Sequence, residues 1–319
     1  MPDPSRPATS GTGIAESYAH CRRIARAEAR NFYYGFRLLP PAKHAALCAL
    51  YAFMRWVDDI TDAPGDRVEK ARGLALARET VERVARGDTS GAVILPALAH
   101  TLATYCIPRS YLDELIAGAE MDLEITSYRA FENLRVYCHG VAGIVGQCCV
   151  HVFGFEDPRA LELADRLGLA FQLTNILRDV AQDYALGRVY LPEEDLERFG
   201  CPRSQVAAAP PAKAARELFR FEAQRARGFY DEGAALLSLI GQDSRAALWA
   251  LARIYGGLLG KMEARDYDVT SSRVRLSAAE KTWILCRARF GLWSEENGFE
   301  THSDSGRGTG RAVVGSGSR

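Results

Sequence analysis

The chain has 319 residues, of which 48% are hydrophobic and 25% charged, and this is ample for a large buried core. Its 40 basic side chains balance 40 acidic ones, so the basic excess of nucleic-acid-binding proteins is absent and we expect no nucleic-acid partner. The N-terminus lacks the layout of a signal peptide, and no run of 18 apolar residues predicts a membrane span. We therefore expect a cytoplasmic protein, soluble or peripheral to the inner face of the membrane.

The sequence pattern is helical almost throughout, because Ala, Leu, Arg and Glu dominate and apolar residues recur at intervals of three and four. Residues 1–13 and 301–319 are rich in small and polar residues. We therefore expect a disordered N-terminal lead and a flexible C-terminal tail. Residues 14–300 predict a single all-α domain, a large helical bundle. Its expected helices cover residues 14–29, 41–61, 66–87, 91–106, 109–120, 130–154, 158–185, 212–239, 242–267 and 277–292.

The first acidic cluster, Asp58, Asp59 and Asp62, follows the apolar run of residues 47–54. At 3.6 residues per turn Asp58 and Asp62 share one helix face, and Arg55 lies on the same face three residues before Asp58. A lone DDxxD sequence on a helix is more often a solvated surface. Here the acids end an apolar segment, where an unpaired carboxylate is costly, and this favours a functional role.

Residues 137–147, YCHGVAGIVGQ, place three glycines at intervals of three within a helical pattern. Each glycine costs ~1 kcal/mol against alanine in a helix interior, so the small residues need a reason. Close packing by another helix is the default explanation, although a long hydrocarbon would use the same gap. We expect His139 to be a hydrogen-bonded histidine within the bundle and not a metal ligand, because no His or Cys lies at zinc-ligand spacing from it.

The second acidic cluster lies on the predicted helix 158–185 and also follows an apolar run. Asn175, Asp179 and Asp183 form a stripe at i, i+4 and i+8, with Arg178 beside Asp179. Inward-facing rows of acids need positive charge, and hard oxygen ligands at this spacing suit Mg²⁺, which usually completes its shell with water and substrate phosphate. Downstream, Arg188 and Tyr190 lie where the chain leaves the helix, and an arginine there suits phosphate. The two clusters together predict a helical enzyme that binds diphosphates through magnesium.

Several motifs occur in an order that resembles the squalene/phytoene synthase family, all-α enzymes of the isoprenoid synthase type that join two prenyl diphosphates head to head. The resemblance covers about residues 18–289. Within it, the last segment is similar to bacterial presqualene diphosphate synthases. The motifs are RNFYYGFRLLP, YAFMRWVDDITD, YCHGVAGIVG, AFQLTNILRDVAQDYALGRVYLP and ARIYGGLLGKMEARDYDVTSSRVRLS.

The resemblance implies a central cavity and assigns roles to residues on its walls. Mg²⁺, with Mn²⁺ as a substitute, would bind Asp58, Asp59, Asp62, Asn175, Asp179 and Asp183. Tyr137 matches a family tyrosine linked to proton handling or cation stabilisation, and Arg178 would contact or orient diphosphate. Further substrate contacts are implied for Arg30, Phe32, Arg55, Gln172, Arg188, Tyr190, Tyr255 and Arg273. The departures are Asn31 for the usual serine, Gln182 for glutamate and His139 for tyrosine, and none removes a metal ligand.

The implied chemistry begins when magnesium and arginines polarise one leaving diphosphate until its allylic bond ionises. The double bond of the second substrate attacks the cation, loss of a proton closes a cyclopropane, and an apolar cavity keeps water away. Some members stop there, whereas others rearrange the product with or without hydride from NADPH. No G-x-G-x-x-G sequence follows a strand, but family members use NADPH without that motif, so its use stays open.

For the substrate, the analogy favours farnesyl diphosphate (C15) and a presqualene diphosphate or squalene product, as in hopanoid pathways. The alternative is geranylgeranyl diphosphate (C20) and phytoene, a carotenoid precursor. We expect peripheral membrane contact for release of the hydrocarbon, and downstream isoprenoid enzymes as partners. A terpene cyclase would pair DDxxD with an Asn/Asp–Ser–Glu motif, and a head-to-tail elongase would carry a second DDxxD; neither is present. A non-catalytic helical scaffold explains the bundle but not two inward acidic rows.

Overall fold

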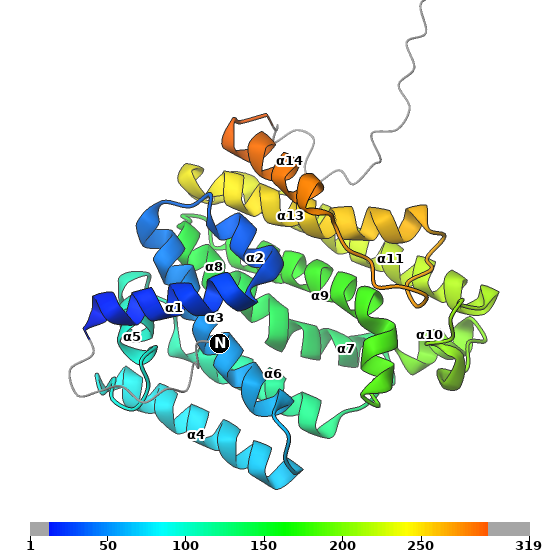
Figure 1. The fold of residues 1–319 in the computed structure, drawn as a ribbon, viewed down its shortest axis with the longest axis horizontal. Coiled ribbons are helices and arrows are strands. Elements are labelled where there is room, and N and C mark those ends of the chain that lie inside the picture. Colours follow the sequence, from blue (N-terminus) through cyan, green and yellow to red (C-terminus); the bar gives the residue numbers. More distant parts are fainter. Residues whose placement is uncertain (1–12, 293–319) are drawn as a thin grey trace, which may run out of the picture.

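The computed structural model describes residues 13–292, and within that range every regular element is helical (Figure 1). The predicted lead (except Gly13), the predicted tail and residues 293–300 of the predicted domain lie outside the described residues. The helices are α1 (Ile14–Glu28), α2 (Arg30–Phe36), α3 (Pro41–Asp62), α4 (Arg67–Ala85), α5 (Leu95–Thr104), α6 (Arg109–Glu124), α7 (Phe131–Cys138), α8 (Ile144–Phe153), α9 (Arg159–Ala185), α10 (Glu193–Arg198), α11 (Lys213–Gly233), α12 (Leu236–Leu239), α13 (Gln242–Ala264) and α14 (Ala278–Arg289).

Local sequence signals fix many of the helix ends. Pro41 occupies the first position of α3, where its missing N–H costs nothing. Asp66 and Glu69 form a capping box at the start of α4, and Ser277 and Glu280 form one at the start of α14. The long α9 ends just before Gly187, whose φ of +80° suits glycine.

The predicted helices 130–154 and 212–239 are each interrupted. The first contains a π-helical turn, His139–Gly143, between α7 and α8, and the second is divided into α11 and α12. Two short helices, α2 and α10, were not predicted, because seven and six residues are too few to show a helical period. A 3₁₀ turn follows α10 at Arg203–Gln205.

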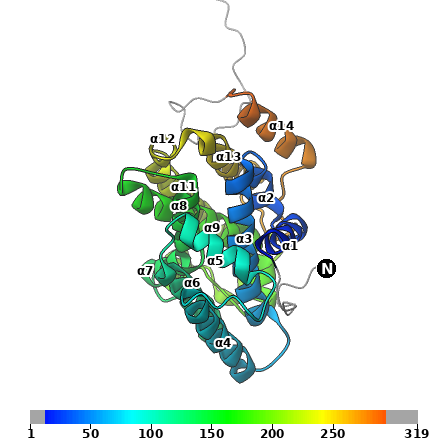
Figure 2. The ribbon, with the colours of Figure 1, turned by 90° about the vertical axis from the view of Figure 1, so that its left-hand side faces the viewer.

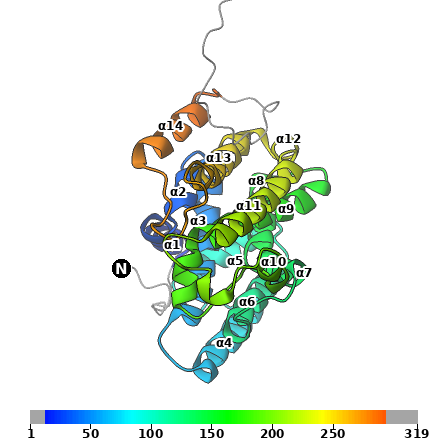
Figure 3. The ribbon, with the colours of Figure 1, turned by 90° about the vertical axis from the view of Figure 1, so that its right-hand side faces the viewer.

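Helix α9 lies at the centre of the bundle and packs against α11, α8, the π-turn and α13 (Figures 1 and 2). The other long helices surround it, with α4 at the lower edge of the view and α14 at the upper edge, outside α13 (Figures 1 and 3). The fold is thus an all-α bundle, as the sequence pattern predicts. Two isolated bridges, Ser127 with Val189 and Phe155 with Ile240, join loops across it.

The glycines of residues 137–147 bring helices into backbone contact. A Cβ on Gly140 would lie 3.0 Å from the Cα of Gly118 on α6. On the other side, a Cβ on Gly168 of α9 would lie 2.5 Å from the carbonyl oxygen of Ala142. Small residues therefore let α6, the π-turn and α9 pack closely, which is the default explanation of the glycine pattern.

Within the described residues, the run Phe131–Phe153 is long and apolar enough to span a membrane, with a mean hydropathy of 1.4. Half of that window is buried inside the bundle, where Phe153, Cys148 and Leu134 are almost fully covered. A buried core helix meets the same criteria, and the glycine contacts above place this run among α6 and α9.

Candidate active site

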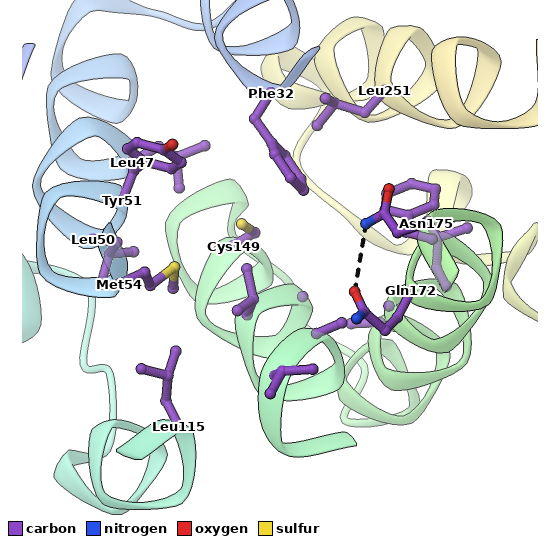
Figure 4. Close-up of a pocket in the computed structure, with 18 of the residues that line it drawn as sticks. Phe32, Leu47, Leu50, Tyr51, Met54, Leu115, Cys149, Gln172, Asn175 and Leu251 are labelled. Carbon is purple, nitrogen blue, oxygen red and sulfur yellow. Dashed lines mark hydrogen bonds between the residues drawn. The ribbon is translucent and has the colours of Figure 1, made fainter. Parts of the chain in front are cut away.

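A largely apolar cavity of about 300 Å³ lies between α3, α6, α8, α9 and α13, with α2 across one side (Figure 4). Along three helices, the residues that line the cavity change from apolar to polar toward the C-terminal end of the helix. On α3 it runs from Leu47 and Leu50 to Asp58, and on α9 from Leu167 to Asn175. On α6 it runs from Leu115 to Asp122. The cavity therefore has an apolar body and a polar end built by the C-terminal turns of these helices.

The first acidic cluster occupies the last turns of α3. Asp58 lines the cavity, and its carboxylate is open to the cavity space although protein surrounds it. Asp59 forms an ion pair with Arg55 one turn earlier, and both side chains are about one-third exposed, at 35% and 32%. Asp62 is exposed at the end of the helix. The structure thus directs Asp58 inward and ties Asp59 to Arg55 on the flank.

The second cluster occupies α9, and its first member, Asn175, faces the same cavity. Gln172 and Asn175 line it, and the Asn175 side-chain N–H donates to Oε1 of Gln172 at 3.4 Å (Figure 4). The side-chain oxygen of Asn175 is buried and has no hydrogen-bond partner. Since an unpaired buried acceptor is costly, this oxygen is suited to a cation or a donor that enters the cavity.

Two arginines hold Asp179 by both carboxylate oxygens. Arg178 donates from Nε at 2.9 Å, and Arg273, in the loop after α13, donates from Nε at 2.8 Å and from Nη2 at 3.0 Å. Burial raises the pKa of Asp179, but these hydrogen bonds and charges outweigh it and leave the pKa below its ordinary value. Asp179 is therefore ionised, with its two arginines fixed at the cavity's polar end.

Sequence analysis missed Asp122, which the structure places at the polar end from α6. Its carboxylate accepts from the hydroxyls of Tyr190 at 2.8 Å and Tyr137 at 3.1 Å. Its backbone carbonyl accepts from Arg188 at 3.4 Å. The one signal in the sequence was an acid after the apolar residues 115–119, and Glu114, Glu120 and Glu124 on the same segment obscured it.

Tyr137 and Tyr190 belong to a stack of three tyrosine rings. Their centroids are 5.2 Å apart with ring planes at 21°, and Tyr128 stacks on Tyr190 at 6.1 Å. A hydrogen bond from the Val189 N–H to the Thr126 carbonyl, 3.0 Å, fixes the segment that carries Arg188 and Tyr190 beside α6. Burial raises the pKa of Tyr137 well above its usual value, so its hydroxyl is protonated.

The acids of the three helices influence one another across the cavity. Burial and then the charge of Asp62 raise the pKa of Asp58 to about 7. Burial and then the charge of Asp179 raise the pKa of Asp183 to about 7. Asp122 contributes to both shifts, so it lies within electrostatic range of both clusters. Mutual repulsion of this kind is relieved by bound positive charge.

The donor set is suited to a hard cation that also binds substrate. Within residues 13–292, no three His, Cys, Asp or Glu side chains converge closely enough to hold a metal on their own. The clustered carboxylates with raised pKa values and the unpaired oxygen of Asn175 are nevertheless the hard ligands that Mg²⁺ takes. Magnesium commonly binds one or two carboxylates and completes its coordination shell with water and phosphate. The carboxylates and the Asn175 oxygen found here fit this mode of binding.

The remaining predicted residues lie around this centre. Phe32 lines the cavity from α2, and its ring lies 5.5 Å from that of Tyr255, which stacks on Phe171 at 4.5 Å. Burial raises the pKa of Tyr255 to about 12. Asp183 and Arg188 line a small hollow together with Tyr190. Arg30 is the first residue of α2.

Residues 25–280 match the family model described as squalene/phytoene synthase. The phytoene synthase of Mycobacterium tuberculosis is 36% identical over 281 residues, which cover 87% of this chain and 92% of that protein. A crystal structure of a dehydrosqualene synthase in complex with ligand superposes with a TM-score of 0.81 at 28% identity, covering 88% of this chain and 97% of its own. The squalene synthase HpnC of Alicyclobacillus acidocaldarius superposes with a TM-score of 0.74 at 29% identity, covering 80% and 96%.

Proposed function

The chain belongs to the squalene/phytoene synthase family, and from this premise we propose that it joins two molecules of geranylgeranyl diphosphate head to head to form phytoene. Members of the family are prenyltransferases that act on prenyl diphosphates. The C15 substrate favoured by sequence analysis becomes the second candidate, because relatives of 36% and 33% identity are named phytoene synthases. The dehydrosqualene and squalene synthase structures, at 28% and 29% identity, support that second candidate.

The observation that carries the proposal is the apolar cavity whose polar end gathers acids from three helices with fixed arginines. Two prenyl chains require an apolar space, and two diphosphates require concentrated positive charge. Asp58, Asn175 and Asp183 would hold Mg²⁺, with Asp62 and Asp179 beside them. Bound magnesium would supply Lewis-acid charge to the leaving diphosphate.

The chain's own residues perform the remaining work. Arg178 and Arg273 are held in place by Asp179 and can donate outward hydrogen bonds to diphosphate oxygens. Arg188 adds charge beside Asp122 and Asp183. Phe32, Phe171 and Tyr255 present aromatic faces near a developing allylic cation, and the apolar walls exclude the water that would convert it to an alcohol.

The pair Tyr137 and Asp122 suits the proton that leaves during ring closure. The Tyr137 hydroxyl is protonated and donates to the Asp122 carboxylate at 3.1 Å. A proton released beside the stack can pass to the tyrosine oxygen while the tyrosine proton moves to Asp122, whose pKa burial raises. Tyr137 is left as it began, and Asp122 would then pass the one proton gained to the released diphosphate or to water.

The proposal includes a location. A C40 or C30 hydrocarbon does not leave into water, so we place the enzyme in the cytoplasm with peripheral contact at the inner face of the membrane. Downstream isoprenoid enzymes that receive the hydrocarbon are the expected partners. We propose no obligatory NADPH, since phytoene formation needs no hydride.

The test is incubation of the purified full-length protein with Mg²⁺ and either geranylgeranyl or farnesyl diphosphate, with and without NADPH, and mass spectrometry of the products. A C40 product from the longer substrate is expected, with no product in EDTA and recovery when Mg²⁺ or Mn²⁺ is added. A C30 product formed only from farnesyl diphosphate would replace the proposal by the second candidate, and dependence on NADPH would identify squalene. Absence of condensation from either substrate would refute both.

A further inference from the structure

Helix α14 carries its apolar stripe on the outside of the molecule. Ala279, Trp283, Cys286 and Phe290 follow one another at intervals of four, three and four residues, so they share one face of the helix. All four are exposed, Trp283 at 64% and Phe290 at 74%. In a soluble helix the apolar stripe normally faces the core, and here it faces away.

The opposite face of α14 fixes the helix firmly to the bundle. Ala288 is buried, and Ile284 and Leu285 pack against the core. Lys261 of α13 pairs with Glu280 at 2.7 Å, and the Ser277–Glu280 capping box orders the first turn. The outward stripe is therefore presented by a well-anchored helix.

The charges around the stripe are cationic. Arg287 and Arg289 lie on its two sides, and the guanidinium of Arg287 rests 5.7 Å from the Trp249 ring. The acid of this helix, Glu280, is already paired with Lys261. Apolar side chains bordered by cations complement a bilayer that contains anionic lipids.

The stripe lies directly outside the cavity wall. Helix α14 packs on α13 and α2, and these two helices contribute Phe32, Phe36, Leu248 and Leu251 to the cavity lining (Figures 1 and 4). A membrane that binds α14 would thus face the apolar wall of the cavity.

We infer that α14 is the docking surface for an anionic lipid bilayer, with Trp283, Phe290 and the neighbouring Leu292 entering the interface and Arg289 contacting lipid phosphate. We favour a lipid phosphate over a free anion as the partner of these cations, because apolar side chains lie beside them. The purpose of docking at this wall depends on the proposed function. The assignment of the surface itself depends only on the exposure of its apolar side chains and on the charges beside them.

The test is sedimentation of the full-length protein with vesicles of phosphatidylcholine alone and of equal parts phosphatidylcholine and phosphatidylglycerol. Wild type should bind the anionic vesicles, and added salt should weaken binding. Trp283→Ser with Phe290→Ser should weaken binding at least about tenfold, because each side chain loses its apolar burial. Arg289→Gln should weaken it roughly fivefold. The control Val68→Ser with Leu76→Ser removes two exposed apolar side chains of α4 and should leave binding unchanged.

Two measurements separate the outcomes. Turnover of detergent-solubilised substrate should stay at the wild-type level in the α14 variants, since none of these residues lines the cavity. Vesicle binding by wild type with no condensation would reject the proposed function and keep the docking surface. Equal vesicle binding by wild type and the α14 double variant would overturn the inference, as would a dimer in light scattering that the same double variant abolishes, because a second copy would then occupy the stripe.

Discussion

Arg273 binds both oxygens of Asp179 through its planar fork, at 2.8 and 3.0 Å, from a loop that lies 94 residues further along the chain. With Arg178 on the same carboxylate, Asp179 becomes a fixed support for two cations at the polar end of the cavity. The pair joins α9 to the loop after α13, so the loop's position is part of the site.

Replacement of Arg273 by lysine should test this geometry. Lysine keeps the charge but loses the two parallel hydrogen bonds, and kcat/KM should fall about tenfold or more. Arg275→Lys is the matched control, because it lies in the same loop and its backbone carbonyl, not its side chain, accepts the Lys261 hydrogen bond. Steady-state kinetics at saturating Mg²⁺ measure both, and equal activity of the two variants would contradict a geometric role.

Asp58→Asn and Asp179→Asn should each abolish turnover with little loss of folding. Each removes a carboxylate oxygen from the polar end, where we propose that magnesium and diphosphate bind. Circular dichroism checks the fold, and a thermal shift with Mg²⁺ and pyrophosphate should be present in wild type and absent from both variants. Retained turnover would reject the metal-ligand assignment.

The stability of the metal-free protein should fall as pH rises from about 4 to about 7. The unfolded chain releases the Asp58 proton near pH 4, whereas burial and Asp62 raise the pKa in the folded protein to about 7. In that window the folded state binds more protons, so each rise in pH favours unfolding. Asp58→Asn should reduce this slope, while Asp183 and Glu222, whose pKa values burial raises to about 7 and about 8, retain part of it. Melting temperatures in EDTA between pH 4.5 and 8 measure it, and identical curves would show that Asp58 is not responsible.

Asp122→Asn should lower kcat about tenfold to a hundredfold, because the side chain loses the charge that accepts two tyrosine hydrogen bonds. Tyr137→Phe should have a similar effect, and the double variant should be little worse than either alone, since both act on one hydrogen bond. Tyr128→Phe is the control. Its buried hydroxyl has no partner in the described structure, so the variant keeps the ring stack and should keep wild-type activity.

Gly168→Ala should destabilise the fold by about 1–3 kcal/mol, because its Cβ would meet the Ala142 carbonyl at 2.5 Å and push α9 from the π-turn. Gly228→Ala on α11 meets nothing within 4 Å and should be neutral or stabilising by up to ~1 kcal/mol. Urea denaturation of both variants gives the comparison. Equal free energies of unfolding for the two variants would show that α9 and the π-turn can move apart without loss of stability.

The sequence predicted features that depend on local periodicity. The stripe of Asn175, Asp179 and Asp183 follows from helix geometry alone, and so do the acids that end α3. Asp122 was missed because one acid among several on α6 has no local mark, and only the approach of Tyr137 and Tyr190 from other elements distinguishes it.

The preference for the C15 substrate remains unconfirmed, and the names of the relatives favour the C20 alternative. The motifs that carry the family resemblance are the ones we propose to bind the diphosphates, which the C15 and C20 substrates share. The apolar lining of the cavity is spread over residues of several helices. Overall similarity to named relatives therefore favoured the C20 substrate, where the motif resemblance had favoured C15.

The π-turn at His139–Gly143 adds one residue to a turn of what would otherwise be a single helix. One residue corresponds to a rotation of about 100°, so the two halves of the helix can be oriented independently. Tyr137 points to the acidic end of the cavity, while Val145 and Cys149 present an apolar surface to its body. Deletion of a single residue such as Ala142 would restore a continuous helix and turn one of these surfaces away from the cavity. A one-residue change in length would thus uncouple the polar chemistry from the hydrocarbon space.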